Sequence, residues 1–362
     1  MKLMLRKGDA VEPHEDYGFF GPDSVTWKVW SYPTSLTVGF QRAVVVEELD
    51  PALIAAVDQT EAVRYRPRTR YDRTLRYFAL VAFGDSTATI KASDVLVKIH
   101  AKGVGIEPLS GNRYDANDPH SQLWIHLTAW HSILYAYERY GPGRLSIDEE
   151  RRYWEECAVA AELQTCDPAD VPRTREGIRD YFEAMRPKLA GSEAAQSMMA
   201  HLLDAKVMLP PTPGLLRPLT WIASSALRAA TVATMPHWMR KMGGLRQSRL
   251  TDTLIRPLMR TAFRLMAVNR RLQLRFLPLL SPSTVAVVAP VLLEIEPRQP
   301  RTSTPAEARA RLEILPPREE YARFRAAVAA KLAAKGEEVV TDADVVGAAK
   351  ADEFETVLGP VR

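Results

Sequence analysis

The chain has 362 residues, 46% of them hydrophobic and 25% charged, which is the composition of an ordinary soluble globular protein with a substantial core. This length allows one large domain or two fused domains. Its two cysteines, Cys157 and Cys166, are too few for a disulfide framework and have no metal-binding spacing. We therefore interpret both as buried thiols in a reducing compartment.

The N-terminus and the longest uncharged run give no sign of a targeting or membrane-spanning segment. Residues 1–11 are basic but lack the apolar core of a signal peptide. Residues 276–293 carry no charge, and Pro278, Pro282 and Pro290 interrupt them. We expect buried or interfacial helix fragments there rather than a membrane span. These features predict a cytoplasmic protein.

Helical patterns follow one another along most of the chain. Residues 1–23 are polar and form a predicted arm, and the first pattern begins near Ser24, a plausible helix N-cap. Apolar residues over 36–57 predict a core helix, and Ser146 with Glu149 matches the capping box that starts another helix. Further helices are predicted over 72–83, 87–102, 118–141, 146–163, 173–187, 192–207, 215–234, 250–268 and 317–335.

The fold class follows from what these patterns contain and lack. No stretch shows convincing alternation of polar and apolar residues, and there is no internal repeat. The sequence therefore predicts an all-α fold with a single large helical domain over residues 24–296. The arm of residues 1–23 precedes this domain, and residues 297–362, rich in Ala, Glu, Arg and Lys, form a predicted helical C-terminal appendage.

Chemistry must come from residues outside the common enzyme motifs. The chain has no glycine-rich phosphate loop, no H-E-x-x-H and no G-x-S-x-G. The missing motifs do not exclude a cofactor that needs few protein ligands. Haem is the obvious one, because it requires one axial ligand, an apolar slot and cations for its propionates.

Three of the seven histidines, His100, His126 and His131, lie in apolar helical surroundings. From residue chemistry alone, each is more often a hydrogen-bonded core histidine than a metal ligand. Motifs around them alter that balance. Five short motifs occur in order: Phe20–Trp27, Arg70-x-x-x-Thr74, Ile99-His100-Ala101, Tyr114-x-Ala116-Asn117-Asp118-Pro119 with Leu123–His126, and Met235-Pro236-x-Trp238-Met239-Arg240.

Through these motifs the chain resembles the family of latex-clearing proteins (rubber oxygenases) and the fungal oxygenase of mycophenolic acid biosynthesis. The resemblance implies a helical bundle, globin-like in general architecture, that encloses a haem b pocket. It implies that His100 is the proximal iron ligand and that Arg70 and Thr74 lie near the haem. Their i,i+4 spacing puts Arg70 and Thr74 on one helix face. It also implies that His126 lines or supports the cofactor pocket.

The chain departs from the family pattern at several positions. Arg73 stands where latex-clearing proteins have a lysine, and arginine stays protonated and does not ordinarily ligate iron. We therefore expect Arg73 to gate the distal face rather than to bind the metal. No residue aligns with the family's proposed catalytic glutamate. Glu47, Glu48 and Asp50 lie only in the same general region.

A basic stretch separates Asp204 from Glu294, with thirteen Lys and Arg residues and Asp252 as its single acid. Arg256 and Arg260 fall on one helical face and are predicted to bind haem propionates. The Trp- and Leu-rich runs between the arginines equally suit contact with a membrane surface through residues 205–293. A solvated basic face over a packed core is the third interpretation. No nucleic-acid-binding module accompanies the charge, so no nucleic acid partner is predicted.

The sequence thus predicts a haem b-dependent oxygenase. Dioxygen would bind opposite His100, near Arg70, Arg73 and Thr74, and the substrate would be a small apolar, unsaturated molecule such as an isoprenoid. The alternative is a non-catalytic helical protein that binds haem or lipid at a membrane surface. A third possibility is a relative without cofactor, in which His100 is a core residue.

Overall fold

Helices make up nearly all the regular structure in the computed structural model, which describes residues 11–60, 66–204 and 214–334. The α-helices are α1 (Val25–Trp30), α2 (Phe40–Val46), α3 (Pro51–Thr60), α5 (Pro67–Phe83), α6 (Ser86–His100), α7 (Pro119–Tyr140), α8 (Ile147–Ala161), α9 (Arg175–Met185), α10 (Glu193–Leu202), α11 (Arg217–Ala233), α12 (His237–Met242), α13 (Arg249–Val268), α14 (Arg270–Leu280), α15 (Val285–Leu292), α16 (Pro305–Leu312) and α17 (Pro317–Ala334). Strands β1 (Val104–Ile106) and β2 (Arg113–Asp115) form one antiparallel hairpin. The predicted all-α class is confirmed.

Capping side chains fix where the central helices begin. The Asp85 carboxylate accepts a hydrogen bond from the Ala88 N–H at the start of α6. The Asp118 carboxylate does the same at the start of α7. Ser146 and Glu149 form the predicted capping box of α8. Each cap satisfies backbone donors that the first helical turn leaves unpaired.

The single helix predicted over 36–57 is wrong, because the chain breaks it into short pieces. A π-helical turn at Ser35–Gly39 leads into α2, and a 3-10 turn at Glu47–Leu49 precedes α3. Pro51 begins α3 and forces Asp50 into an extended conformation, with φ −78° and ψ 121°. Because of this break, Glu47 and Glu48 lie in a 3-10 turn and not in a continuous α-helix.

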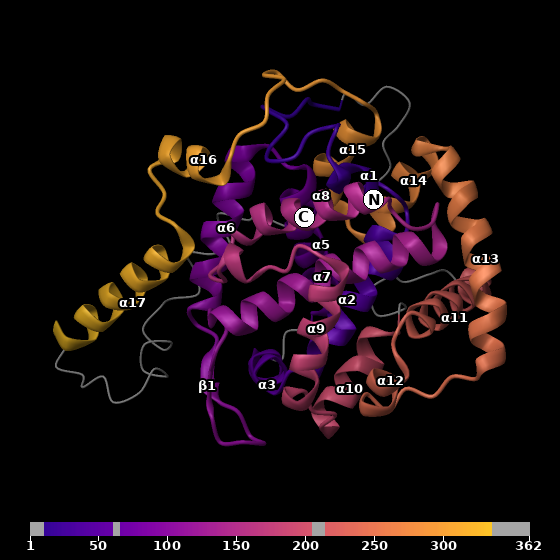
Figure 1. The fold of residues 1–362 in the computed structure, drawn as a ribbon, viewed down its shortest axis with the longest axis horizontal. Helices are drawn as coiled ribbons and strands as arrows, with labels where there is room; N and C mark the ends of the chain where they lie inside the picture. The colour runs from indigo at the N-terminus through magenta and orange to yellow at the C-terminus, as the bar shows by residue number, and fades with distance from the viewer. Residues whose placement is uncertain (1–10, 61–65, 205–213, 335–362) are drawn as a thin grey trace.

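Helix α7 is the central element, and α2 packs along it (Figure 1). Large aromatic side chains fill the surrounding core, and Trp30, Trp124, Trp130 and Trp154 are each almost fully buried. Gly39 lets the two segments approach closely. A Cβ atom at this position would lie 3.0 Å from the Ile133 Cα atom. Arg42 of α2 is therefore held against the middle of α7.

The described part of the N-terminal arm packs against the segment that precedes α16, at the top of the helical body in Figure 1. The backbone of residues 14–18 hydrogen-bonds to that of residues 298–303. Helices α16 and α17 lie against α6, where Arg309 is buried and its Nη2 atom donates to Ser93 Oγ. Residues 1–10 of the predicted arm and 335–362 of the predicted appendage lie outside the described residues.

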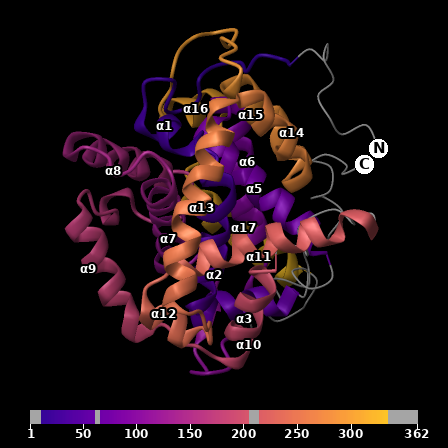
Figure 2. The same ribbon diagram turned by 90° about the vertical axis from the view of Figure 1, so that its right-hand side faces the viewer.

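Helices α11 and α13 form an outer layer over α7 (Figure 2). Helix α13 buries little more than Ile255 and Phe263, and its outward leucines are 60–68% exposed: Leu250, Leu254, Leu258 and Leu265. Residues 205–213 of the basic stretch lie outside the described residues. Among the helices that the structure describes, none is long and apolar enough to cross a membrane.

Candidate functional site

Arg70 and Thr74 of α5 line one small cavity together, as their spacing predicts. The cavity has a volume of about 70 Å³. Helix α2 and the turn after it form one wall, and the end of α10 forms another. The lining residues are Phe40, Val44, Glu47, Glu48, Pro67, Arg70, Tyr71, Thr74, His201 and Leu202.

Two carboxyl groups face Arg70 across this cavity. Burial raises the pKa of the Glu47 carboxyl to about 8, and the Arg70 guanidinium opposes part of that rise. Burial and the neighbouring Glu47 raise the pKa of Glu48 further, and Arg70 again opposes the rise. The Glu48 side chain is 3% exposed, and its Oε2 atom has no hydrogen-bond partner in the described structure. At neutral pH the pair can hold a proton and pass it on.

His100 ends α6 and lies within electrostatic range of the same arginine. Burial, followed by the positive charge of Arg70, lowers the pKa of the His100 imidazole to about 4. The ring is therefore neutral at physiological pH, which is the form that binds metals. Gln122 of α7 lies beside it, with its Nε2 atom 3.2 Å from His100 Nδ1 and 2.6 Å from the Ala116 carbonyl oxygen.

The Gln122 amide determines which ring nitrogen of His100 carries the proton. Because its NH₂ group donates to the Ala116 carbonyl, the same group donates to His100 Nδ1 and leaves the proton on Nε2. A metal ligand that binds through Nε2 needs the opposite tautomer. A rotated Gln122 amide would present its Oε1 atom to a protonated Nδ1, but it would lose the hydrogen bond to the Ala116 carbonyl oxygen.

His126, also predicted to bind the cofactor, is 2% exposed and hydrogen-bonded through both ring nitrogens. Its Nε2 atom lies 2.7 Å from the Cys157 carbonyl oxygen, and Gln164 Nε2 lies 3.0 Å from its Nδ1 atom. Burial lowers the pKa of His126 to about 4. The ring lies 5.9 Å from that of Trp130. This environment is that of a packed core histidine, and it lines neither the cavity at Arg70 nor the larger one described below.

The other predicted site residues lie apart from this cavity. Arg73 is exposed on α5 and does not line it. Arg256 is exposed on α13. Arg260 Nη2 lies 3.5 Å from the Pro142 carbonyl oxygen, just beyond the C-terminal end of α7, whereas Gln122 and His100 lie at the N-terminal end. The structure therefore brings Arg70 and Thr74 to one cavity. His100 lies within electrostatic range of Arg70 but does not line this cavity, and Arg256 and Arg260 lie elsewhere.

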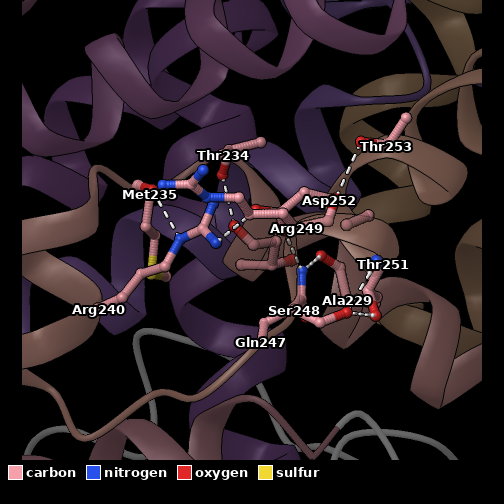
Figure 3. A network of polar contacts seen from close by, with 12 residues as sticks. Ala229, Thr234, Met235, Arg240, Gln247, Ser248, Arg249, Thr251, Asp252 and Thr253 are labelled. Atoms are coloured by element: carbon pink, nitrogen blue, oxygen red, sulfur yellow. Dashed lines mark hydrogen bonds and ion pairs between the residues drawn. The ribbon is translucent and has the colours of Figure 1, made fainter.

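The motif that begins at Met235 lies at a second, larger cavity of about 350 Å³. Met235, Trp238 and Met239 form part of its wall. Figure 3 shows the polar network behind this wall. Arg240 pairs with Asp252 at 2.7 Å and donates from Nε to the Met235 carbonyl oxygen at 2.9 Å. The network fixes the turn between α11 and α12 against α13.

Comparison with known families identifies the fold. The family model for the ER-bound oxygenase mpaB/B′ and rubber oxygenase catalytic domain matches residues 27–270, more than half of the chain. The chain belongs to this family. It therefore carries an oxygenase catalytic domain, and it is an oxidoreductase. Searches of curated proteins and of solved structures give no match. The predicted globin-like architecture stays a prediction.

The oxygenase family is consistent with a metal or haem cofactor. Among the described residues, no group of three or more His, Cys, Asp or Glu side chains is placed to hold a bare metal ion. Haem would need one neutral imidazole, and His100 is the residue that would hold it, although its ring does not line the cavity. The cavity at Arg70 is smaller than the ~300 Å³ typical of a small-molecule pocket, so a bound macrocycle would push its lining side chains apart.

Sequence reasoning did not find three members of this site. Glu47 and Glu48 were placed only in the right region, and Gln122 was not considered. The sequence did contain an indication of the glutamates, because two acidic residues interrupt an otherwise apolar run just before Asp50-Pro51. Gln122 carried no such signal, because its role depends on where α6 ends.

Proposed function

We propose that the protein is a haem b-dependent oxygenase in which His100 is the axial ligand of the iron. The placement of Arg70 carries the proposal. Arg70 lines the cavity together with the Glu47 and Glu48 carboxyls, and its positive charge also lowers the pKa of His100. When bound, haem b supplies the redox-active iron that activates dioxygen.

The side chains at the cavity have separate roles in this proposal. Arg70 supplies a fixed positive charge that stabilises negative charge developing during the reaction, and Thr74 adds a hydroxyl from the same helix face. Glu47 holds or accepts a proton near neutral pH, because its pKa is raised to about 8. Arg73, exposed on the same helix as Arg70, would gate access to the cavity.

The proposed substrate is a small apolar, unsaturated molecule of isoprenoid or lipid type. Phe40, Val44 and Leu202 give the cavity the apolar part of its wall. Such a wall binds a hydrocarbon chain and excludes water, which strengthens the electrostatic effect of Arg70.

Oxygen consumption tests the activity. The purified protein loaded with haem is expected to consume dioxygen in the presence of an unsaturated isoprenoid such as squalene, and His100→Ala is expected to abolish this consumption. A protein that binds haem but consumes no dioxygen with any isoprenoid or unsaturated lipid would instead support the non-catalytic haem- or lipid-binding alternative.

The exposed leucines of α13 support an additional proposal, peripheral contact with a membrane. Leu250, Leu254 and Leu258 are exposed and follow at four-residue spacing, so they form one apolar stripe on α13. Helix α13 lies in the outer layer of the molecule (Figure 2). Arg256 and Arg260 lie on the neighbouring face of the same helix. An apolar stripe beside a basic one suits an anionic lipid surface.

Sedimentation with vesicles tests this contact. The protein is expected to co-sediment with vesicles that contain phosphatidylserine, and Leu254→Ser with Leu258→Ser is expected to release it. A matched double substitution of exposed polar residues on the opposite side, Glu176→Ser with Arg179→Ser on α9, should leave binding intact. Equal binding of both variants would contradict the proposed contact.

A further inference from the structure

The larger cavity lies between helices that the Arg70 site does not use. Its volume of about 350 Å³ is within the range of small-molecule pockets. Helices α2, α7, α8 and α9 and the turn between α11 and α12 surround it, and Figure 2 shows α7, α8, α9 and α12 on one side of the molecule. The apolar part of the wall includes Leu134, Ile178, Phe182, Ala233, Met235 and Trp238.

Arg42 places a buried positive charge at this cavity. Its side chain is 1% exposed. Its Nη1 atom donates to Ser132 Oγ at 2.6 Å and lies 3.4 Å from His131 Nδ1, and the Tyr135 ring centre lies 5.3 Å from its Cζ atom. The Nε atom has no hydrogen-bond partner, and no carboxylate among the described residues pairs with the guanidinium. His131 offers no compensation, because burial and Arg42 lower its pKa and keep it neutral.

A buried cation without a counter-ion is unfavourable, and proteins usually pair it. Burial lowers the pKa of Arg42 to about 10, with Tyr135 opposing the change, so the group stays charged at neutral pH. An anion that enters the cavity would supply the missing partner. Guanidinium binds a carboxylate with two parallel hydrogen bonds, which favours this anion over a spherical ion.

The other charged groups of the cavity are already engaged. Arg175 lies between two carboxylates, with Nη2 2.6 Å from Glu138 Oε1 and 2.7 Å from Glu150 Oε2. This leaves Glu150 Oε1 without a partner. The Trp154 indole Nε1, one helical turn further along α8, has no partner either. One acceptor and one donor on the same helix face are the partners that a hydroxyl group needs.

The cavity is separate from the Arg70 site although α2 serves both. Phe40, Val44 and Glu47 face the small cavity, whereas Arg42 lines the large one. At ~100° per residue, Arg42 is rotated by roughly 160–200° from Phe40 and Val44 around the helix axis. No residue lines both cavities.

We propose that this cavity binds a small organic monocarboxylate with a largely apolar body, its carboxylate on Arg42. A hydroxyl group at the far end of the ligand would donate to Glu150 and accept from Trp154. The ligand is a binding partner in addition to the oxygenase substrate, and the proposal does not depend on haem.

Titration of the wild-type protein with three matched probes tests the site. The probes are sodium phenylacetate, sodium 4-hydroxyphenylacetate and neutral phenylacetamide, and the readout is the ¹H–¹⁵N indole signals of Trp154 and Trp238. Both carboxylates are expected to shift these signals to saturation. The amide should bind about tenfold more weakly or worse, since a hydrogen bond to a charged group contributes ~1.5–3 kcal/mol. No shift with either carboxylate, or equal binding of the amide, would overturn the proposal.

Two variants locate the contacts. Arg42→Met should weaken both carboxylates about tenfold or more. Arg151→Met, which removes an exposed arginine of α8, should bind them like wild type. Trp154→Phe should remove the preference for the hydroxylated probe, with Trp238 as the remaining reporter. Unchanged binding by Arg42→Met would contradict the assignment of the carboxylate to Arg42. If that variant does not fold, the comparison of acid and amide on the wild-type protein decides.

Discussion

The two cavities on either side of α2 each contain an arginine, and they surround it in different ways. At the small cavity, Arg70 faces Glu47 and Glu48, so its charge has partners within the protein. At the large cavity, Arg42 has a hydroxyl and a neutral imidazole but no carboxylate among the described residues. The first arrangement holds charges and protons ready for chemistry, and the second leaves a charge to be completed by a ligand. Helix α2 thus lines both cavities, one in which the arginine has carboxyl groups nearby and one in which it has none paired with it in the described part of the chain.

The largest effect is expected at Arg70. Arg70→Ala removes the fixed charge from the catalytic cavity and should lower haem-supported oxygen consumption about 100-fold, the usual loss for one electrostatic contact to a transition state. Arg68→Ala, an exposed arginine on the same helix, serves as the control and should change the rate little. Equal losses of oxygen consumption in both variants would contradict a catalytic role for Arg70.

The next largest effect is expected at Gln122, which contacts the His100 ring. Gln122→Leu removes the group that orients this imidazole and should weaken haem binding about 10–100-fold, the range found for groups that support metal ligands. Gln122→Glu, which accepts a hydrogen bond from Nδ1–H, should retain binding and lower the iron reduction potential. An unchanged affinity for Gln122→Leu would show that His100 needs no such support.

A smaller effect is expected on the free energy of unfolding, where Arg42 can be compared with a second buried arginine, Arg309. Arg309 is also buried, and its Nε atom also lacks a partner in the described structure, but its guanidinium donates to both Ser93 Oγ and the Leu315 carbonyl. Arg309→Met should therefore lower the free energy of unfolding by ~2 kcal/mol, because it removes hydrogen bonds to a charged group. Arg42→Met removes a buried charge without a carboxylate partner and should change stability by less than ~1 kcal/mol. Urea denaturation measures both, and equal losses would indicate that Arg42 is already satisfied.

A gradual effect is expected in the pH dependence of stability. Because the folded-state pKa of Glu47 is raised to about 8 from an ordinary 4.5, the folded protein binds more protons than the unfolded chain between these values. This group therefore makes stability fall as pH rises through that window, by up to ~1 kcal/mol per pH unit. Glu47→Gln carries no proton and should flatten the curve. Denaturation between pH 5 and 8 checks this, and identical slopes would contradict the raised pKa.

The sequence predicted those features that depend on neighbours along the chain. The caps at Asp118 and Ser146 act within one helical turn, so the starts of α7 and α8 were readable. The break at Asp50-Pro51 was also local, and the 36–57 prediction overlooked it. The ordered motifs identified the family and drew attention to Arg70 and Thr74, which do share a cavity.

The rest of the two sites depends on contacts between distant segments. Glu47 reaches Arg70 only because α2 packs beside α5, and no spacing in the sequence encodes that contact. The large cavity is assembled from segments as far apart as Arg42 and Met239. The missing partner of Arg42 is a property of the whole arrangement, so sequence reasoning had no means to find it.

A haemin titration of three proteins, followed at the Soret band, tests the central claim most directly. Wild type and Arg42→Met are expected to develop the band with similar affinity, whereas His100→Ala is expected to develop none. That result would place the haem ligand at His100 and separate it from the large cavity. A full Soret band in His100→Ala, or its loss in Arg42→Met, would contradict the account.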